Sequence, residues 1–236
     1  MIFKTKKGKG AILKAVFSAV FLIVLAGAVF LYASKNKKTG QDNVPPIIRQ
    51  VAGLNKDIKK TTIDLYNASE KLDSLSMVQS RITDIRSAIE LIGELRQMVK
   101  ANQNAVDTLI LFIEAHEDFF RRKNLSWIFA IKEFYTNHNV VQHHKSRANF
   151  LAAFEALLQY TYKNFQNIMV LKSPQYIKGY DVYYMRYRRA ADSHNRFNKK
   201  RIAFQTAFVE EHPEVKSLLP GAHHLGSFKF WDKFSF

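Results

Sequence analysis

Apolar residues recur along much of this chain at alternating steps of three and four, which is the spacing of one face of an α-helix. One such seam runs from Ile47 to Leu75, and a second runs from Val78 to Val99. The step from the first seam to the second is three residues and follows another step of three, so the alternation is broken there. The pattern therefore predicts either one long helix with a stammer or two helices joined at residues 73–76. We expect residues 47–101 to form an elongated, coiled-coil-like helical stalk.

Helical periodicity continues after this stalk and predicts a helical bundle over residues 104–220. Asn102 to Asn104 is a polar interval before a wide apolar face at 105–122. The later apolar stripes predict helices over 127–135, 140–171 and 174–211. Ser173-Pro174 is a typical helix start, and His212-Pro213 a typical end. The fold class is therefore all-α.

The last 16 residues, 221–236, have a different pattern. Phenylalanines recur at even steps, which predicts a short extended strand. A single strand must pair or dock, so this tail either docks on a partner or folds back into a groove between helices. The candidate partner-docking residues are Phe228, Phe230, Phe234 and Phe236.

Near the N-terminus, residues 15–33 carry no charge. A helix of this length spans about 28 Å, close to the hydrocarbon thickness of a bilayer. Five lysines precede the segment, in residues 1–14, and three follow it in the polar linker 34–46. This bias favours a single-pass transmembrane helix with the N-terminus inside and a periplasmic or extracellular body. The alternative is a signal peptide cleaved after Ala26-Gly27-Ala28.

Composition narrows the class of protein further. Gly and Pro are scarce, at 9 and 5 residues, and Cys is absent. Disulfides and thiolate metal sites are therefore excluded. The net charge of +16 is unevenly distributed, since residues 121–236 hold 19 basic and 8 acidic side chains. The basic N-terminus is explained by membrane topology, but the basic C-terminal half indicates an anionic partner or a solubility requirement.

No motif in the sequence supports catalysis or a cofactor. Of the eight histidines, His116 lies in the densest acidic group, but neither the H-E-x-x-H pattern of zinc proteases nor the Glu-x-x-His pattern of di-metal bundles occurs. His143 and His144 are adjacent, which makes a poor chelate on a helix. We expect these histidines to be solvated or to cap helices, and we expect no metal, no cofactor and no enzymatic activity. A hydrolase with an unrecognised site is the remaining enzymatic alternative.

Residues 172–201 are the sharpest candidate for binding, with nine basic and two acidic side chains. Tyrosines and phenylalanines from Tyr176 to Phe208 form one face of the predicted helix. Basic residues recur at three and four on another face, where arginine can bind phosphate or carboxylate. The aromatic stripe is also typical of a helix core with a solvated basic back. The candidate anionic-ligand-binding residues are Arg186, Arg189, Arg196 and Lys200.

Together these features predict a membrane-anchored, extracytoplasmic helical scaffold or adaptor of a cell-envelope assembly. Its expected partners are membrane lipid, through residues 15–33, and one or more envelope proteins. The alternative is a binding module for anionic envelope polymer or lipid head groups. An extracytoplasmic body argues against nucleic acid. An N-terminal anchor followed by long helices resembles LemA-type envelope proteins in outline.

Overall fold

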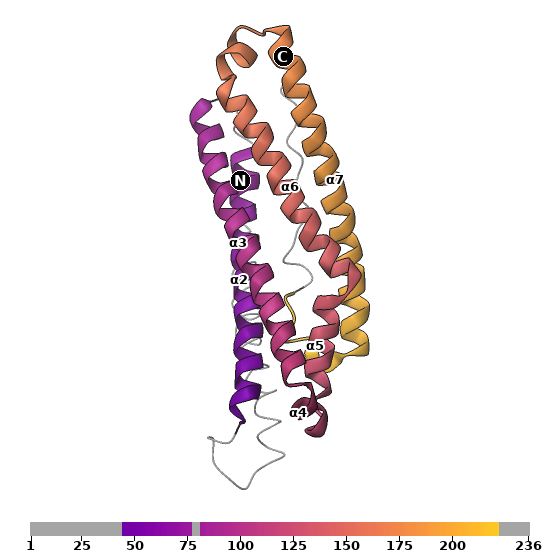
Figure 1. Ribbon diagram of the computed structural model, residues 1–236. Coiled ribbons are helices and arrows are strands. Elements are labelled where there is room, and N and C mark those ends of the chain that lie inside the picture. The colour runs from indigo at the N-terminus through magenta and orange to yellow at the C-terminus, as the bar shows by residue number, and fades with distance from the viewer. Residues whose placement is uncertain (1–43, 77–80, 222–236) are drawn as a thin grey trace, which may run out of the picture. The chain divides into compact units, whose positions relative to one another are not determined.

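The computed structural model describes residues 44–76 and 81–221, and its regular structure in these ranges is entirely helical, so the all-α prediction is confirmed there (Figure 1). The predicted membrane segment 15–33 and the aromatic tail after Gly221 lie outside the described residues. Within the described ranges, no helix is both long enough and apolar enough to cross a bilayer. The chain divides into two units, Met1–Gln50 and Val51–Phe236. The packing below concerns the second unit.

The first seam forms α2 (Pro46–Ser76) and the second forms α3 (Ile82–Ala115), so there are two helices. The predicted joint at residues 73–76 is wrong, because these residues are helical and belong to α2. Helix α3 buries nine residues at strictly alternating steps of three and four, from Ile85 to Ile113. It continues without a break through the polar interval 102–104. The predicted boundary between stalk and bundle therefore falls inside a helix. Asn102 occupies a seam position and is buried.

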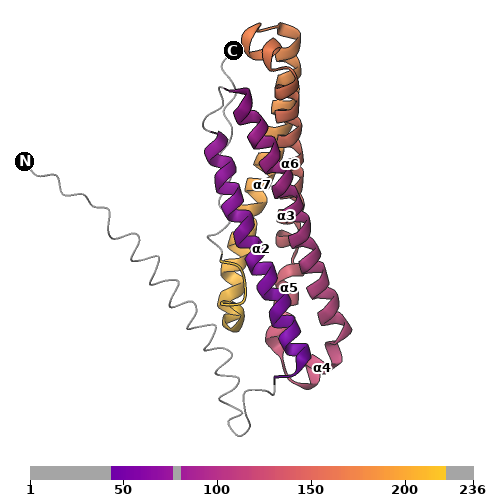
Figure 2. The same ribbon diagram turned by 90° about the vertical axis from the view of Figure 1, so that its left-hand side faces the viewer.

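Helices α2 and α3 contribute to the same hydrophobic core as the helices that follow them. Leu65, Leu72 and Ile92 cluster with Phe150 and Tyr187 in one group of buried side chains. Figures 1 and 2 show α2, α3, α6 and α7 running alongside one another. The part of the predicted stalk in this unit is thus packed as part of the bundle.

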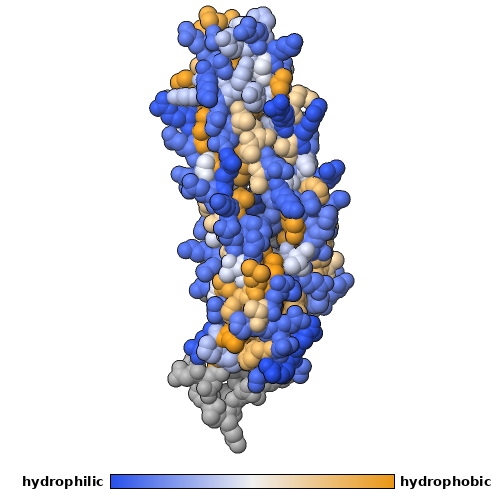
Figure 3. Space-filling model, viewed as in Figure 1, coloured by the Kyte–Doolittle hydropathy of each residue, from blue (hydrophilic) through white to orange (hydrophobic). Residues whose placement is uncertain are grey.

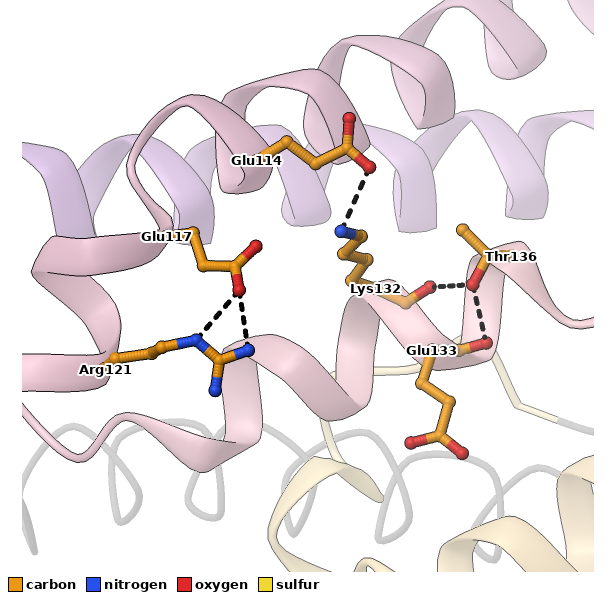
Figure 4. Close-up of polar contacts among 6 residues, drawn as sticks. All are labelled: Glu114, Glu117, Arg121, Lys132, Glu133 and Thr136. Carbon is orange, nitrogen blue, oxygen red and sulfur yellow. Dashed lines mark hydrogen bonds and ion pairs between the residues drawn. The ribbon is translucent and has the colours of Figure 1, made fainter.

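A corner of two short helices reverses the chain after α3. The apolar face at 105–122 is divided between two helices, because α3 ends at Ala115 and α4 (Glu117–Arg122) follows. Helix α5 (Ser126–Thr136) comes next, after Asn124 adopts a left-handed backbone with φ of 52°. Lys132 of α5 pairs with Glu114 of α3 at 3.0 Å (Figure 4). This ion pair helps to hold the corner against α3.

Helices α6 (His138–Lys163) and α7 (Pro174–Glu211) form a long hairpin. Asn137 caps α6 by accepting a hydrogen bond from the Asn139 backbone N–H. The predicted helix over 140–171 is interrupted, because α6 ends at Lys163 and the π-helical turn η1 (Gln166–Val170) follows. The predicted bounds of α7 are confirmed. A 3-10 turn, η2 (Pro213–Val215), then packs near α5 and α7.

The first half of α7 packs through aromatic side chains. Tyr180 and Tyr187 are buried, and Tyr187 contacts Phe154 with 4.8 Å between ring centroids. Tyr160 of α6 stacks on Tyr183 at 4.8 Å, and its hydroxyl donates to the Tyr176 carbonyl at 3.2 Å. The ring of Tyr160 lies directly over Gly179. A Cβ at position 179 would approach its Oη to 2.0 Å and its Cζ to 2.6 Å.

Candidate functional site

The four basic residues predicted to bind an anion form an exposed surface of α7, which we call the basic face (Arg186, Arg189, Arg196 and Lys200). All four side chains are exposed. They belong to the helix whose opposite side is buried, because α7 places Tyr187, Ala191 and His194 in the core. Helix periodicity alone therefore separates the basic face from the core stripe.

Aromatic rings next to the basic face support its side chains. The Arg186 guanidinium lies 5.7 Å from the centre of the Tyr183 ring, and that of Arg196 lies 5.2 Å from the Phe197 ring. The ammonium of Lys200 lies 5.8 Å from the same Phe197 ring. Cation–π contacts of this kind orient a cation without neutralising it. The charges of the basic face are thus held at the surface and remain available to an anion.

Acidic side chains do not balance these charges. In the part of the chain that the structure describes, no ion pair joins a residue of the basic face to a carboxylate. The corner around α4 differs, since Glu117 pairs there with Arg121 and Glu114 with Lys132 (Figure 4). Hydrophilic side chains cover much of the surface seen in Figure 3, with apolar residues in smaller patches between them. The basic face is therefore a candidate site for a charged partner.

The second half of α7 buries a different set of residues, which sequence analysis missed. We call them the Arg–His cluster. They lie on α6 and α7, and four of them are almost fully buried: His143 and His194 are 1% exposed, Arg147 5% and Arg201 3%. His144 is half-buried. The complete cluster is His143, His144, Arg147, His194 and Arg201.

Hydrogen bonds and ring stacking join the cluster across the two helices. Arg147 Nη2 lies 3.3 Å from His143 Nε2, and the rings of His143 and His194 stack at 5.0 Å. Arg201 Nη1 donates to Gln205 Oε1 at 2.6 Å, and its Nη2 donates to Asn198 Oδ1 at 3.2 Å. Two guanidinium groups are therefore held in the interior by polar partners.

Burial shifts the pKa of every member of the cluster toward its neutral form, and neighbouring positive charge adds to the shift for all members except Arg201. Burial, with the charges of Arg147 and Arg201, lowers the pKa of His144 and that of His194 to about 3. The same causes hold the pKa of His143 well below its ordinary value. Burial also lowers the pKa of Arg147 to about 10, with a further contribution from Arg201. At neutral pH the histidines are uncharged and both arginines carry their protons.

A small cavity of about 20 Å³ adjoins the cluster. Side chains from α2, α3, α5, α6 and α7 line it, together with Pro220. Asn102 of α3 donates nearby to Thr61 Oγ1 at 2.6 Å and to Thr62 Oγ1 at 3.2 Å, which ties α3 to α2. The polar residues that line the cavity are Thr62, Asn102, Tyr135, His143, His144, Arg147, Arg201 and Gln205.

The periodicity of α7 contains the signal that would have found this cluster. Continuing from Tyr187 by fours and threes gives Ala191, His194, Asn198, Arg201 and Gln205, and all of them are buried. The predicted aromatic stripe contained Ala191 and His194, but it then continued through Phe197 and Phe204, which are only half-buried, and omitted Asn198, Arg201 and Gln205. The expectation that the histidines are solvated or cap helices is wrong for His143 and His194.

Among the described residues, the remaining sequence candidates do not form a second site. His116 Nδ1 contacts the Phe112 carbonyl at 2.9 Å, while Glu114 and Glu117 form ion pairs with basic side chains. In the described ranges, no group of three histidine, aspartate or glutamate side chains is placed to hold a metal ion. The candidate docking residues Phe228, Phe230, Phe234 and Phe236 lie outside the described residues.

Comparison of the chain with protein-family models, with curated proteins and with solved structures finds no match.

Proposed function

We propose that this protein is a membrane-anchored, non-enzymatic helical adaptor that binds an anionic partner through the basic face of α7. The exposure of four basic side chains, with no ion pair to a carboxylate in the described residues, is the observation that carries the proposal. Exposed basic residues cost little to maintain in water, but their concentration on one helix creates a positive potential. Such a surface attracts phosphate or carboxylate groups.

In this proposal the apolar segment 15–33 anchors the chain, with its N-terminus inside and the helical body on the other side of the membrane. The body acts as a scaffold in a cell-envelope assembly, and the aromatic tail 221–236 supplies a second contact to a protein partner. The partner of the basic face is either an anionic lipid head group or an anionic envelope polymer. Both sources present closely spaced negative charges, which arginine binds through paired N–H groups.

The test uses the full-length chain in nanodiscs of neutral lipid. One assay measures its co-flotation with vesicles containing phosphatidylglycerol, and a second measures its retention by immobilised polyphosphate. We expect binding in at least one assay, and we expect it to weaken as salt is raised, because exposed charges are screened beyond about 8–10 Å at physiological ionic strength. Vesicle binding alone identifies lipid as the partner, and polymer binding alone identifies a polyanion.

A charge-matched control separates a specific face from net charge. Changing the four residues of the basic face to Gln should abolish most binding while leaving the unfolding temperature nearly unchanged, because exposed charges contribute little to stability. The control changes four other exposed basic residues to Gln and removes the same net charge. Equal losses in both variants would refute a specific face, as would binding that survives in the first variant. The control residues are Lys56, Lys60, Arg122 and Lys123.

A further inference from the structure

We propose that the cavity at the Arg–His cluster is a binding site for a single monatomic anion of the size of chloride. This site is separate from the basic face, since its charged residues lie on the buried sides of α6 and α7. Its occupant would be an integral part of the fold. Three observations support the site: the buried charge, an unused hydrogen-bond donor, and the size of the cavity.

The buried charge is the first observation. Arg147 and Arg201 both line the cavity, at 5% and 3% exposure. Transferring a guanidinium from water to a protein interior is costly unless a counter-charge accompanies it. Arg147 donates its hydrogen bond to a neutral imidazole, and it forms no ion pair with any residue of the described ranges. A bound anion next to Arg147 would supply that counter-charge.

The unused donor is the second observation. A guanidinium can only donate, so His143 Nε2 must accept the hydrogen bond from Arg147. The proton of the neutral ring then resides on Nδ1. This N–H is buried, and it has no acceptor in the part of the chain that the structure describes. An orphaned buried donor is destabilising, and an anion that accepts from it would remove that cost.

The size of the cavity selects the class of ligand. A volume of about 20 Å³ holds roughly one water molecule, or an ion of similar radius. This volume favours a monatomic anion over phosphate, sulfate or a carboxylate-bearing ligand, which need more room. Chloride fits the charge of the site and accepts hydrogen bonds from any direction. Water fits the volume as well, but it supplies no counter-charge to Arg147.

The experiment compares two sodium salts on the full-length chain in a non-ionic detergent. Thermal unfolding is followed in chloride and in gluconate at equal ionic strength, since gluconate cannot enter the cavity. We expect a saturable rise in the unfolding temperature of about 2–4 °C in chloride, because ligand binding stabilises only the folded state. Bromide should act like chloride. In parallel, ³⁵Cl NMR should show line broadening that bromide suppresses.

Two single variants locate the effect. Arg147→Gln should remove both the chloride-dependent stabilisation and the line broadening. Arg122→Gln, which changes an exposed arginine outside the basic face, should preserve both. Equal unfolding temperatures in chloride and gluconate, with no broadening beyond that of the unfolded chain, would overturn the proposal and indicate a water-filled cavity. This comparison needs only the natural sequence, so it is decisive even if Arg147→Gln fails to fold. Chloride effects that persist unchanged in folded Arg147→Gln would also overturn it.

Discussion

Replacing Gly179 with alanine should lower the free energy of unfolding, whereas replacing Gly93 with alanine should raise it. Both glycines lie inside long helices, where replacement by alanine ordinarily stabilises by about 1 kcal/mol. At Gly93 a new Cβ meets no atom within 4 Å, so this gain should appear in full. At Gly179 the new Cβ would lie 2.0 Å from Tyr160 Oη and 2.6 Å from Cζ, so the whole end of that ring must move.

The cost of that movement follows from the contacts of Tyr160. Its hydroxyl donates to the Tyr176 carbonyl, a bond that contributes about 0.5–1.5 kcal/mol. Its stacking on Tyr183 contributes about the same again. Losing both gives about 1–3 kcal/mol, so the free energy of unfolding of Gly179→Ala should lie that far below that of Gly93→Ala. Urea unfolding of the full-length chain in non-ionic detergent measures the difference.

A double-mutant cycle tests the assigned cause. In a Tyr160→Ala background the obstructing ring is absent, so Gly179→Ala should stabilise by the same amount as Gly93→Ala does. The coupling energy between positions 160 and 179 should therefore equal about 1–3 kcal/mol. If Gly179→Ala proved as stable as Gly93→Ala in the natural background, the Tyr160 ring would have to move freely, and the packing argument for this end of α7 would be refuted.

Three further predictions concern pH, the core and the anchor. Because burial lowers the folded-state pKa of His144 and His194 to about 3, their contribution to stability is complete above pH 6.5 and is lost as pH falls toward 3, by about 2 kcal/mol for each of the two at pH 5; a flat unfolding temperature from pH 7 to 5 would contradict this. Ile85→Ala, at a fully buried position, should cost about 2–5 kcal/mol in urea unfolding, whereas Ile63→Ala, at 43% exposure, should change stability by less than about 0.5 kcal/mol. Mass spectrometry of the membrane-extracted protein should find the N-terminal segment intact, and a mature start at Val29 would establish the signal-peptide alternative.

The sequence was sufficient to predict the helices and much of their buried stripes. Steps of three and four identified Ile58, Leu65 and Ile85 as core residues, and Ser173-Pro174 located the start of α7. These signals succeed because they are local, since a helix displays its periodicity and its ends within a few turns. The break near residues 73–76 was ambiguous because a stammer and a joint leave the same apolar spacing.

The Arg–His cluster was missed because its burial depends on distant parts of the chain. Arg147 and Arg201 lie 54 positions apart. Each of them, considered alone, is a residue type that is normally found at a solvated surface. Only the hairpin of α6 and α7 brings them to one cavity, with Asn102 of α3 and Thr62 of α2 completing its wall. The periodicity of α7 places Asn198, Arg201 and Gln205 at seam positions, but their polar side chains are typical of a solvated surface. The basic face, in contrast, lies on one helix, so the spacing of its residues in the sequence was enough to predict it.

The two halves of α7 bury different types of side chain. This difference divides the bundle into one region that is sensitive to pH and one that is not. Tyrosine and phenylalanine rings in the first half bear no charge between pH 4 and 8, so their packing is indifferent to mild acid. The second half depends on imidazoles that must stay deprotonated. On acidification we therefore expect amide hydrogen exchange to accelerate first in residues 194–208 of α7 and in the opposing turns of α6, while amides around Tyr180 stay protected. Acid would then separate α6 from α7 first at the end of the hairpin next to α5, while the opposite end stays packed.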